Sequence, residues 1–139
     1  MNNPAGADRA SFTLWWVIAL FACLLALGLV VDGGGKLHAG ERAQLVAEDA
    51  ARAAGQAIML PLAKQGTAVV LNPMTAVGYA QLSLARAGVV GTAVVTGPTT
   101  VLVTTTVVYQ PKILGLVGVG PQIVTGQATA HLQHTNTGF

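Results

Sequence analysis

The chain has 139 residues, a length that suits one domain of ordinary size. Hydrophobic residues make up 53% of the chain and charged residues only 9%, a combination that excludes intrinsic disorder. The formal net charge of +2 includes no basic cluster that could meet a phosphate backbone, so nucleic-acid binding is excluded as well. Cys23 is the only cysteine, which excludes an intramolecular disulfide and a multi-cysteine zinc site.

Residues 12–31 form a stretch of twenty residues without a charge. As a helix this stretch is about 30 Å long, which matches the hydrocarbon core of a bilayer. It is longer than the apolar core of a cleaved secretory signal, so we expect a retained single-pass membrane helix. Residues 1–11 would then be a short cytoplasmic arm, and the rest of the chain would lie outside the cytoplasm. The residues expected near the ends of this anchor are Phe12, Trp15, Trp16 and Val31.

The next two segments differ in composition. Residues 32–35 are Gly-rich and predict either a hinge or a weak point inside one long helix. Residues 36–60 are Ala-rich and predict a helix, with Glu48 and Arg52 as a favourable pair one turn apart. Small apolar residues recur along this helix at three- and four-residue spacing, which predicts a face that another helix or a sheet can approach closely. We expect partner helices to pack on this face. This stripe consists of Ala43, Val46, Ala50, Ala53 and Ala57.

Residues 61–139 are predicted to form an extracytoplasmic domain. Asn72 and Pro73 are typical of a helix start and Gly88 of a helix end, which predicts a short helix over 73–87. Its inner face is predicted to hold Val77, Ala80, Leu84 and Ala87. Valine and threonine dominate the chain after Gly88 and predict a small antiparallel sheet, so the fold class is α+β. The three predicted strands are 89–96, 99–110 and 122–132.

Two features of these strands bear on function. Alternation in the second strand places Val101, Val103, Val107 and Tyr109 on one face. The connection to the third strand is apolar and bracketed by Pro111 and Pro121. It predicts either a loop that closes one end of the core or a contact surface for a partner or the membrane. The residues of this predicted contact loop are Ile113, Leu114, Leu116, Val117 and Val119.

The sequence lacks the residue patterns of catalytic and metal sites. All five acidic residues precede residue 50, so no carboxylate is available in the C-terminal half to orient a histidine or act as a base. His38, His131 and His134 have no local partners at metal-ligand spacing. The glycines form no phosphate-binding motif. We therefore expect no enzymatic activity, no cofactor, no metal and no small-molecule substrate.

The order of these segments, together with four short motifs, resembles a known family. The motifs are Arg9-Ala10-Ser11-Phe12-Thr13-Leu14, Leu29-Val30-Val31-Asp32-Gly33-Gly34, the Ala-rich residues 41–53 and Gln127-Ala128-Thr129-Ala130. The chain is similar to the TadE/TadG-like pilus-assembly proteins, the pseudopilin or minor-pilin group of tight-adherence (Flp-type) pili. The resemblance implies a pilin-like fold and a place in the cell membrane or the pilus. It also implies oligomeric contacts with other pilin-like subunits, membrane assembly proteins and the lipid bilayer.

Processed pilins carry a glycine before the cleavage point and a glutamate at the fifth mature position. In this chain, Gly6 or the pair Ala10 and Ser11 are the candidate processing positions, and neither register supplies the glutamate. A subunit that stays in the membrane therefore fits better than a major pilin. The alternative class is a single-pass accessory subunit of another membrane complex.

Charge is scarce even outside the apolar stretch. The 87 residues that follow Arg52 carry only three formal charges, all of them positive. A free soluble domain seldom has so uncharged a surface, so we expect partners to cover much of this domain.

Overall fold

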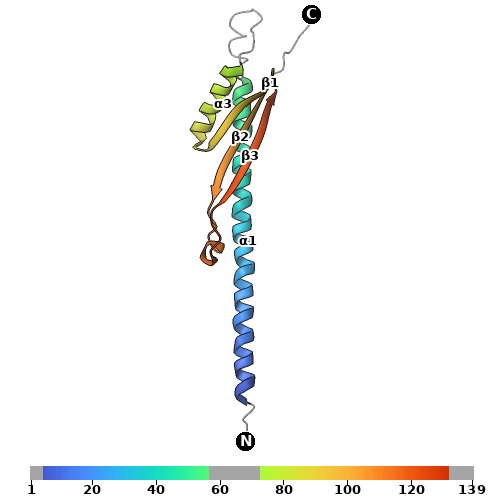
Figure 1. Cartoon of the computed structure of the whole chain (residues 1–139), viewed down its shortest axis with the longest axis vertical. Helices are drawn as coiled ribbons and strands as arrows, with labels where there is room; N and C mark the ends of the chain where they lie inside the picture. Colours follow the sequence, from blue (N-terminus) through green and yellow to red (C-terminus); the bar gives the residue numbers. More distant parts are fainter. Residues whose placement is uncertain (1–4, 57–72, 132–139) are drawn as a thin grey trace, which may run out of the picture.

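The computed structural model describes residues 5–56 and 73–131, with side chains from Ser11 onward. A single long helix runs through the molecule, and a short helix and a three-stranded sheet are packed against its C-terminal half (Figure 1). The N-terminal half of this helix projects alone. The predicted α+β class is therefore confirmed. The elements are α1 (Ala5–Gln56), α3 (Pro73–Ala87), β1 (Val90–Gly97), β2 (Thr100–Tyr109), η1 (Leu114–Val117, a 3-10 turn) and β3 (Gln122–His131).

Helix α1 has 52 residues and is continuous through the Gly-rich stretch. The hinge predicted over 32–35 is therefore corrected, and the second alternative, one long helix, is the one observed. The hinge is absent where other elements pack on both sides of it: the Tyr109 side chain lies against Gly35, and the loop after β2 lies against Gly28, whereas nothing lies within 4 Å of a Cβ added at Gly33 or Gly34. Those contacts hold a segment whose intrinsic helix propensity is poor. Residues 5–11 of the predicted arm, for which the sequence predicts no helix, form the first part of α1. The helix predicted over 36–60 is present as far as Gln56, and 57–60 lie outside the described residues.

The sheet is antiparallel throughout, in the order β1-β2-β3. Its strands agree with the predicted ones to within one residue, apart from Leu132, which lies outside the described residues. On the inner face, Val103 of β2 pairs with Ala93 of β1 and with Ala128 of β3. This face packs on α1 and α3, while no described helix covers the outer face (Figure 1).

The core is built from small side chains, mostly alanine. Ala80 and Leu84 of α3 are buried as predicted, Val77 packs at the edge of the core and Ala87 is only half-buried. Ala76, at the other end of the helix, is fully buried although it is not among the predicted residues. Small residues bring the helix backbones close to the sheet. The buried cluster consists of Ala47, Ala50, Ala51, Ala54, Ala76, Ala80, Leu84, Ala93, Val101, Val103 and Ala130.

The closest approach is between β3 and α1, at Gly126. A Cβ on this residue would lie 2.5 Å from the carbonyl oxygen of Ala43 and 2.5 Å from the amide nitrogen of Gln44. Next to it, the buried hydroxyl of Thr105 donates a 2.7 Å hydrogen bond to the same Ala43 carbonyl. The absence of a side chain at Gly126 therefore sets how closely the sheet can lie on the helix.

Candidate functional site

Asp32 is the first residue after the apolar stretch of α1, and it is 4% exposed. One carboxylate oxygen, Oδ1, accepts hydrogen bonds from the amide of Lys112 at 2.7 Å and from the hydroxyl of Tyr109 at 3.1 Å. The other, Oδ2, accepts from the amides of Ile113 at 3.0 Å and of Leu114 at 2.6 Å. We call this arrangement the Asp32 clamp, and it ties the loop after β2 to α1.

The clamp satisfies backbone groups that would otherwise have no partner in the chain. Three consecutive N–H groups, at residues 112–114, point in one direction as the chain enters η1, and a carboxylate is the side chain best suited to accept all three. Its negative charge also interacts favourably with the partial positive charge on such N–H groups. The loop is therefore held in one position relative to the end of the apolar stretch.

The titration behaviour of the clamp follows from these contacts. Burial by itself raises the pKa of the Asp32 carboxyl, but the hydrogen bonds from three backbone amides and from Tyr109 outweigh it and leave the pKa below its ordinary value. Burial, followed by the hydrogen bond to Asp32 and its charge, raises the pKa of the Tyr109 hydroxyl. At neutral pH the clamp therefore consists of an ionised carboxylate and a neutral phenol.

The loop predicted as a contact surface has two sides. Ile113 and Leu114 are half-buried against α1 at Gly28, and Val119 is also half-buried. Leu116 is 86% exposed and Val117 is 54% exposed. Each predicted role therefore applies to a different side of the loop. Ile113 and Leu114 close the loop onto the helix, and Leu116 and Val117 present an apolar surface to the surroundings.

The stripe predicted to pack against partner helices is corrected. Ala43 and Ala50 are fully buried inside the chain itself, Val46 packs at the edge of the core and Ala53 is half-buried. The sheet and α3 use this face, because the C-terminal half of α1 carries the whole domain. Ala57 lies outside the described residues.

A different face of α1, beside the edge strand β3, is open to solvent. It forms a shallow groove of about 900 Å³, in which Leu37 is 70% exposed and Leu45 is 61% exposed. Val124 of β3 forms the other wall. We call this surface the α1–β3 groove. The described residues that line it are Gly33, Lys36, Leu37, Gly40, Glu41, Gln44, Leu45 and Val124.

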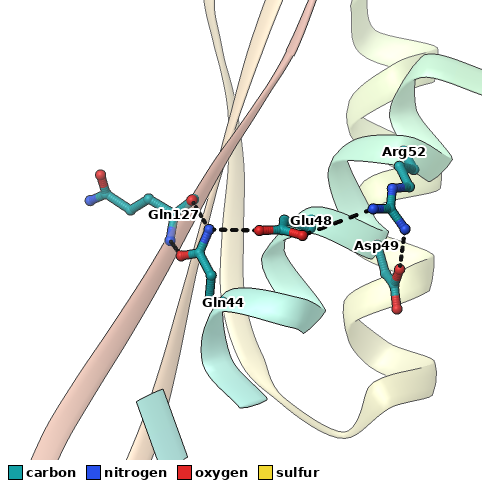
Figure 2. A network of polar contacts seen from close by, with 5 residues as sticks. All are labelled: Gln44, Glu48, Asp49, Arg52 and Gln127. Atoms are coloured by element: carbon teal, nitrogen blue, oxygen red, sulfur yellow. Dashed lines mark hydrogen bonds and ion pairs between the residues drawn. The ribbon is translucent and has the colours of Figure 1, made fainter. Parts of the chain in front are cut away.

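The side chain of Gln44 bridges the helix and the edge strand at this groove (Figure 2). Its Nε2 donates to the carbonyl of Gln127 at 3.0 Å, and its Oε1 accepts from the Gln127 amide at 3.2 Å, so one side-chain amide pairs with the strand as a neighbouring strand would. Glu48 and Arg52 lie beside it as the predicted ion pair, with 3.9 Å between the charged atoms. At this exposed position the ion pair adds little stability.

The glycines at 34 and 35 provide a matched test of the clamp. We expect Gly34→Ala to stabilise the chain by about 0.5–1 kcal/mol, because nothing lies within 4 Å of the added Cβ and alanine favours helix. Gly35→Ala places a Cβ against the ring of Tyr109, so the ring must swing away and its hydrogen bond to Asp32 is lost. Thermal unfolding should give this variant a melting temperature at least about 4 °C below that of Gly34→Ala. Equal melting temperatures would contradict the contact.

The predicted anchor and processing residues all lie on α1. Phe12, Trp15, Trp16 and Val31 are all exposed on the apolar half of α1, and Ser11 is exposed next to them. Gly6 and Ala10 lie on the same helix, although their side chains are outside the described set. Within the residues that the structure describes, no three His, Cys, Asp or Glu side chains gather as metal ligands.

Together, these features define a class of protein: an α+β domain carried by one N-terminal helix that is long and apolar enough to cross a membrane. Residues 6–57 match the family described as putative Flp pilus-assembly TadE/G-like, in agreement with the resemblance seen in the sequence over this stretch. The matched stretch is almost the whole of α1, whereas α3 and the sheet lie beyond it. No curated protein and no solved structure matches the chain.

Proposed function

We propose that this chain is a membrane-anchored, pseudopilin-like structural subunit that takes part in the assembly of a tight-adherence, type IV-like pilus. The observation that carries the proposal is the coincidence of the TadE/G-like match at residues 6–57 with a single helix. The N-terminal half of this helix projects alone and is apolar, and its C-terminal half bears the domain. The role is structural and involves no catalysis.

The anchor is argued from exposure. Apart from the contact of the η1 loop at Gly28, the large side chains of the apolar half of α1 are exposed, including Phe12 at 64%, Leu20 at 63% and Leu29 at 67%. Such a surface is stable only in lipid or against partner helices. We place residues 1–11 on the cytoplasmic side and the sheet outside the cytoplasm, with residues 12–31 in the membrane.

Contacts with other pilin-like subunits are assigned to two surfaces. The first is the α1–β3 groove, whose exposed leucines suit an apolar helix of a neighbouring subunit. The second is the outer face of the sheet, which is made of threonine, valine and other uncharged side chains. The large apolar side chains exposed on this face are Val90, Val94, Val108 and Ile123. These two surfaces replace the alanine stripe as the proposed partner contacts.

A charge placed in the groove tests the first surface. We expect the double variant Leu37→Glu, Leu45→Glu to lose at least about 90% of the pilin-like subunits that co-purify with the tagged chain, because a carboxylate in an apolar contact pays its full desolvation cost. Both side chains are exposed, so the free energy of unfolding should change by less than about 0.5 kcal/mol. Pull-down from solubilised membranes followed by mass spectrometry measures the co-purified subunits. Urea unfolding in detergent measures the free energy of unfolding.

Leu82→Glu serves as the matched control, because Leu82 is an exposed leucine (47%) on α3, away from the groove. This variant should keep its partners. Unchanged co-purification in the groove variant would remove the groove from the proposal. Recovery of a large polytopic complex in fixed stoichiometry, with no pilin-like subunit, would instead favour the accessory-subunit alternative.

A further inference from the structure

The exposed side of the loop around η1 lies beside the end of the apolar stretch. A Cβ on Gly28 would lie 3.0 Å from Cγ2 of Ile113 and 3.3 Å from Cδ2 of Leu114, so the loop touches the helix at that level. Gly28 precedes Val31, the last apolar residue of the stretch, by three residues, or about 4.5 Å along the axis. The loop therefore overlaps the apolar part of α1, below the sheet (Figure 1).

We propose that Leu116 and Val117 insert into the membrane surface next to α1, so that the η1 loop is a second, shallow membrane contact of this chain. The proposal rests on the membrane anchor of the proposed function. The contact of the loop at Gly28, about 4.5 Å along the axis from Val31, is close to the depth of about 5–10 Å at which interfacial apolar groups lie in a bilayer. The occupant of this apolar surface is therefore lipid.

Continuity with the anchor favours lipid over a protein partner. The loop is fixed to α1 by the Asp32 clamp, so its height relative to the apolar stretch is set by the fold. When residues 12–31 lie in a bilayer, the loop that carries Leu116 contacts α1 at Gly28, within that stretch. A protein partner at this position would have to displace the lipid that already surrounds the anchor.

The charge of the loop also favours contact with lipid. Lys112 is the only charged residue between Pro111 and Pro121, and it is exposed. A lysine beside an inserted apolar group can extend its amine to lipid phosphates while its stem stays at the boundary. No acidic residue lies in the loop to oppose an anionic membrane surface.

A second contact has a structural consequence. One membrane helix leaves a domain free to rotate about the helix axis and to tilt. A contact on one side of α1 fixes the side of the domain that faces the membrane. The α1–β3 groove and the outer face of the sheet then have defined directions relative to the bilayer, as lateral assembly of subunits requires.

Site-directed spin labelling of the full chain tests the insertion. Cys23→Ala removes the native thiol, and a nitroxide is attached at Leu116→Cys, an exposed position that the fold does not need. The chain is reconstituted at low protein-to-lipid ratio in vesicles of phosphatidylcholine and phosphatidylglycerol. Collision of the label with oxygen, which is enriched in lipid, is compared with collision with a water-soluble nickel complex. We expect the ratio of oxygen to nickel accessibility at residue 116 to exceed the ratio at a water-exposed site at least about fivefold.

Two control positions separate the inference from the anchor. Leu20→Cys reports the apolar half of α1, and Ile123→Cys reports the outer face of the sheet, where the native side chain is 69% exposed. A high ratio of oxygen to nickel accessibility (a lipid signal) at residue 20, together with a low ratio (a water signal) at residue 116 equal to that at residue 123, overturns the second contact. The anchor is then left intact. A water signal at residue 20 overturns the anchor itself. Spin–spin broadening at residue 116 that persists on dilution with lipid would assign the surface to a second copy and overturn the inference.

Discussion

Replacing Gly126 with alanine is expected to lower the free energy of unfolding of the domain by about 3 kcal/mol, the upper end of what overpacking usually costs. The added Cβ would meet the backbone of α1 at Ala43 and Gln44, and a backbone cannot turn aside as a flexible side chain can. The helix and β3 must therefore separate. Separation also breaks the buried hydrogen bond from Thr105 to the Ala43 carbonyl. Urea unfolding of the full chain in detergent, followed by circular dichroism, measures the loss.

The matched control is Gly78→Ala. Gly78 lies within α3 and nothing is found within 4 Å of the Cβ it lacks, so the alanine variant should gain up to about 1 kcal/mol from helix propensity. The two substitutions have the same chemistry and opposite expected signs. Equal stability of the two variants would show that the sheet does not lie on α1 as closely as described.

The second large expected effect is faster amide exchange in the η1 loop when the Asp32 clamp is broken. In Asp32→Asn, one carboxylate oxygen becomes an NH₂ group that faces backbone N–H donors, so at least one of the three backbone hydrogen bonds is lost and donors oppose each other there. We expect the amides of residues 112–114 to exchange with solvent roughly tenfold to a hundredfold faster, while the core amides of β2 keep their protection. Hydrogen exchange with mass spectrometry on peptides that cover residues 110–121 resolves the two regions.

Asp49→Asn is the control for the loss of one negative charge on α1. Asp49 is exposed, and its contact is a 3.5 Å ion pair with Arg52 on the same helix. Exchange in the η1 loop should be unaffected by this variant. If Asp49→Asn speeds amide exchange in the η1 loop as much as Asp32→Asn does, the effect comes from net charge and not from the clamp.

The clamp also predicts a pH dependence. The folded pKa of Asp32 is lower than the ordinary value of 3.8, so the carboxylate stabilises the folded loop above that pH, and this contribution is lost as the pH falls from 3.8 through the lower folded value. Loop protection, corrected for the intrinsic pH dependence of exchange, should therefore stay constant from neutral pH to about pH 5 and decline in more acidic solution. In Asp32→Asn the same profile should be flat. A decline at neutral pH in the native chain would contradict the lowered pKa.

Much of the fold could be predicted from local patterns. The apolar length of 12–31, the Asn72-Pro73 start, the Gly88 end and the Val/Thr alternation are signals within a few residues of one another, and each predicted element exists close to its expected bounds. Gly88 indeed adopts a positive φ of 64° at the end of α3. Patterns of this kind depend on the backbone period alone.

The functional details depended on contacts between distant residues, and there the sequence misled. The composition of 32–35 places Asp32 in a Gly-rich hinge, although a carboxylate directly after twenty uncharged residues is a usable signal of a specific partner. Thr105 breaks the run of apolar residues on the inner face of β2. Its hydroxyl is buried because the Ala43 carbonyl lies 2.7 Å away, a partner that is 62 residues distant in sequence.

By itself, the sequence determined the membrane-length apolar helix, the α+β class, the order of elements and the resemblance that the match at residues 6–57 confirms. The tertiary structure alone shows which face of α1 is already used, that the glycines are helical, and that the apolar loop is fixed at the end of the apolar stretch. The reason is physical: length, propensity and period act along the chain, whereas burial and hydrogen-bond partners are set by segments that meet only after folding.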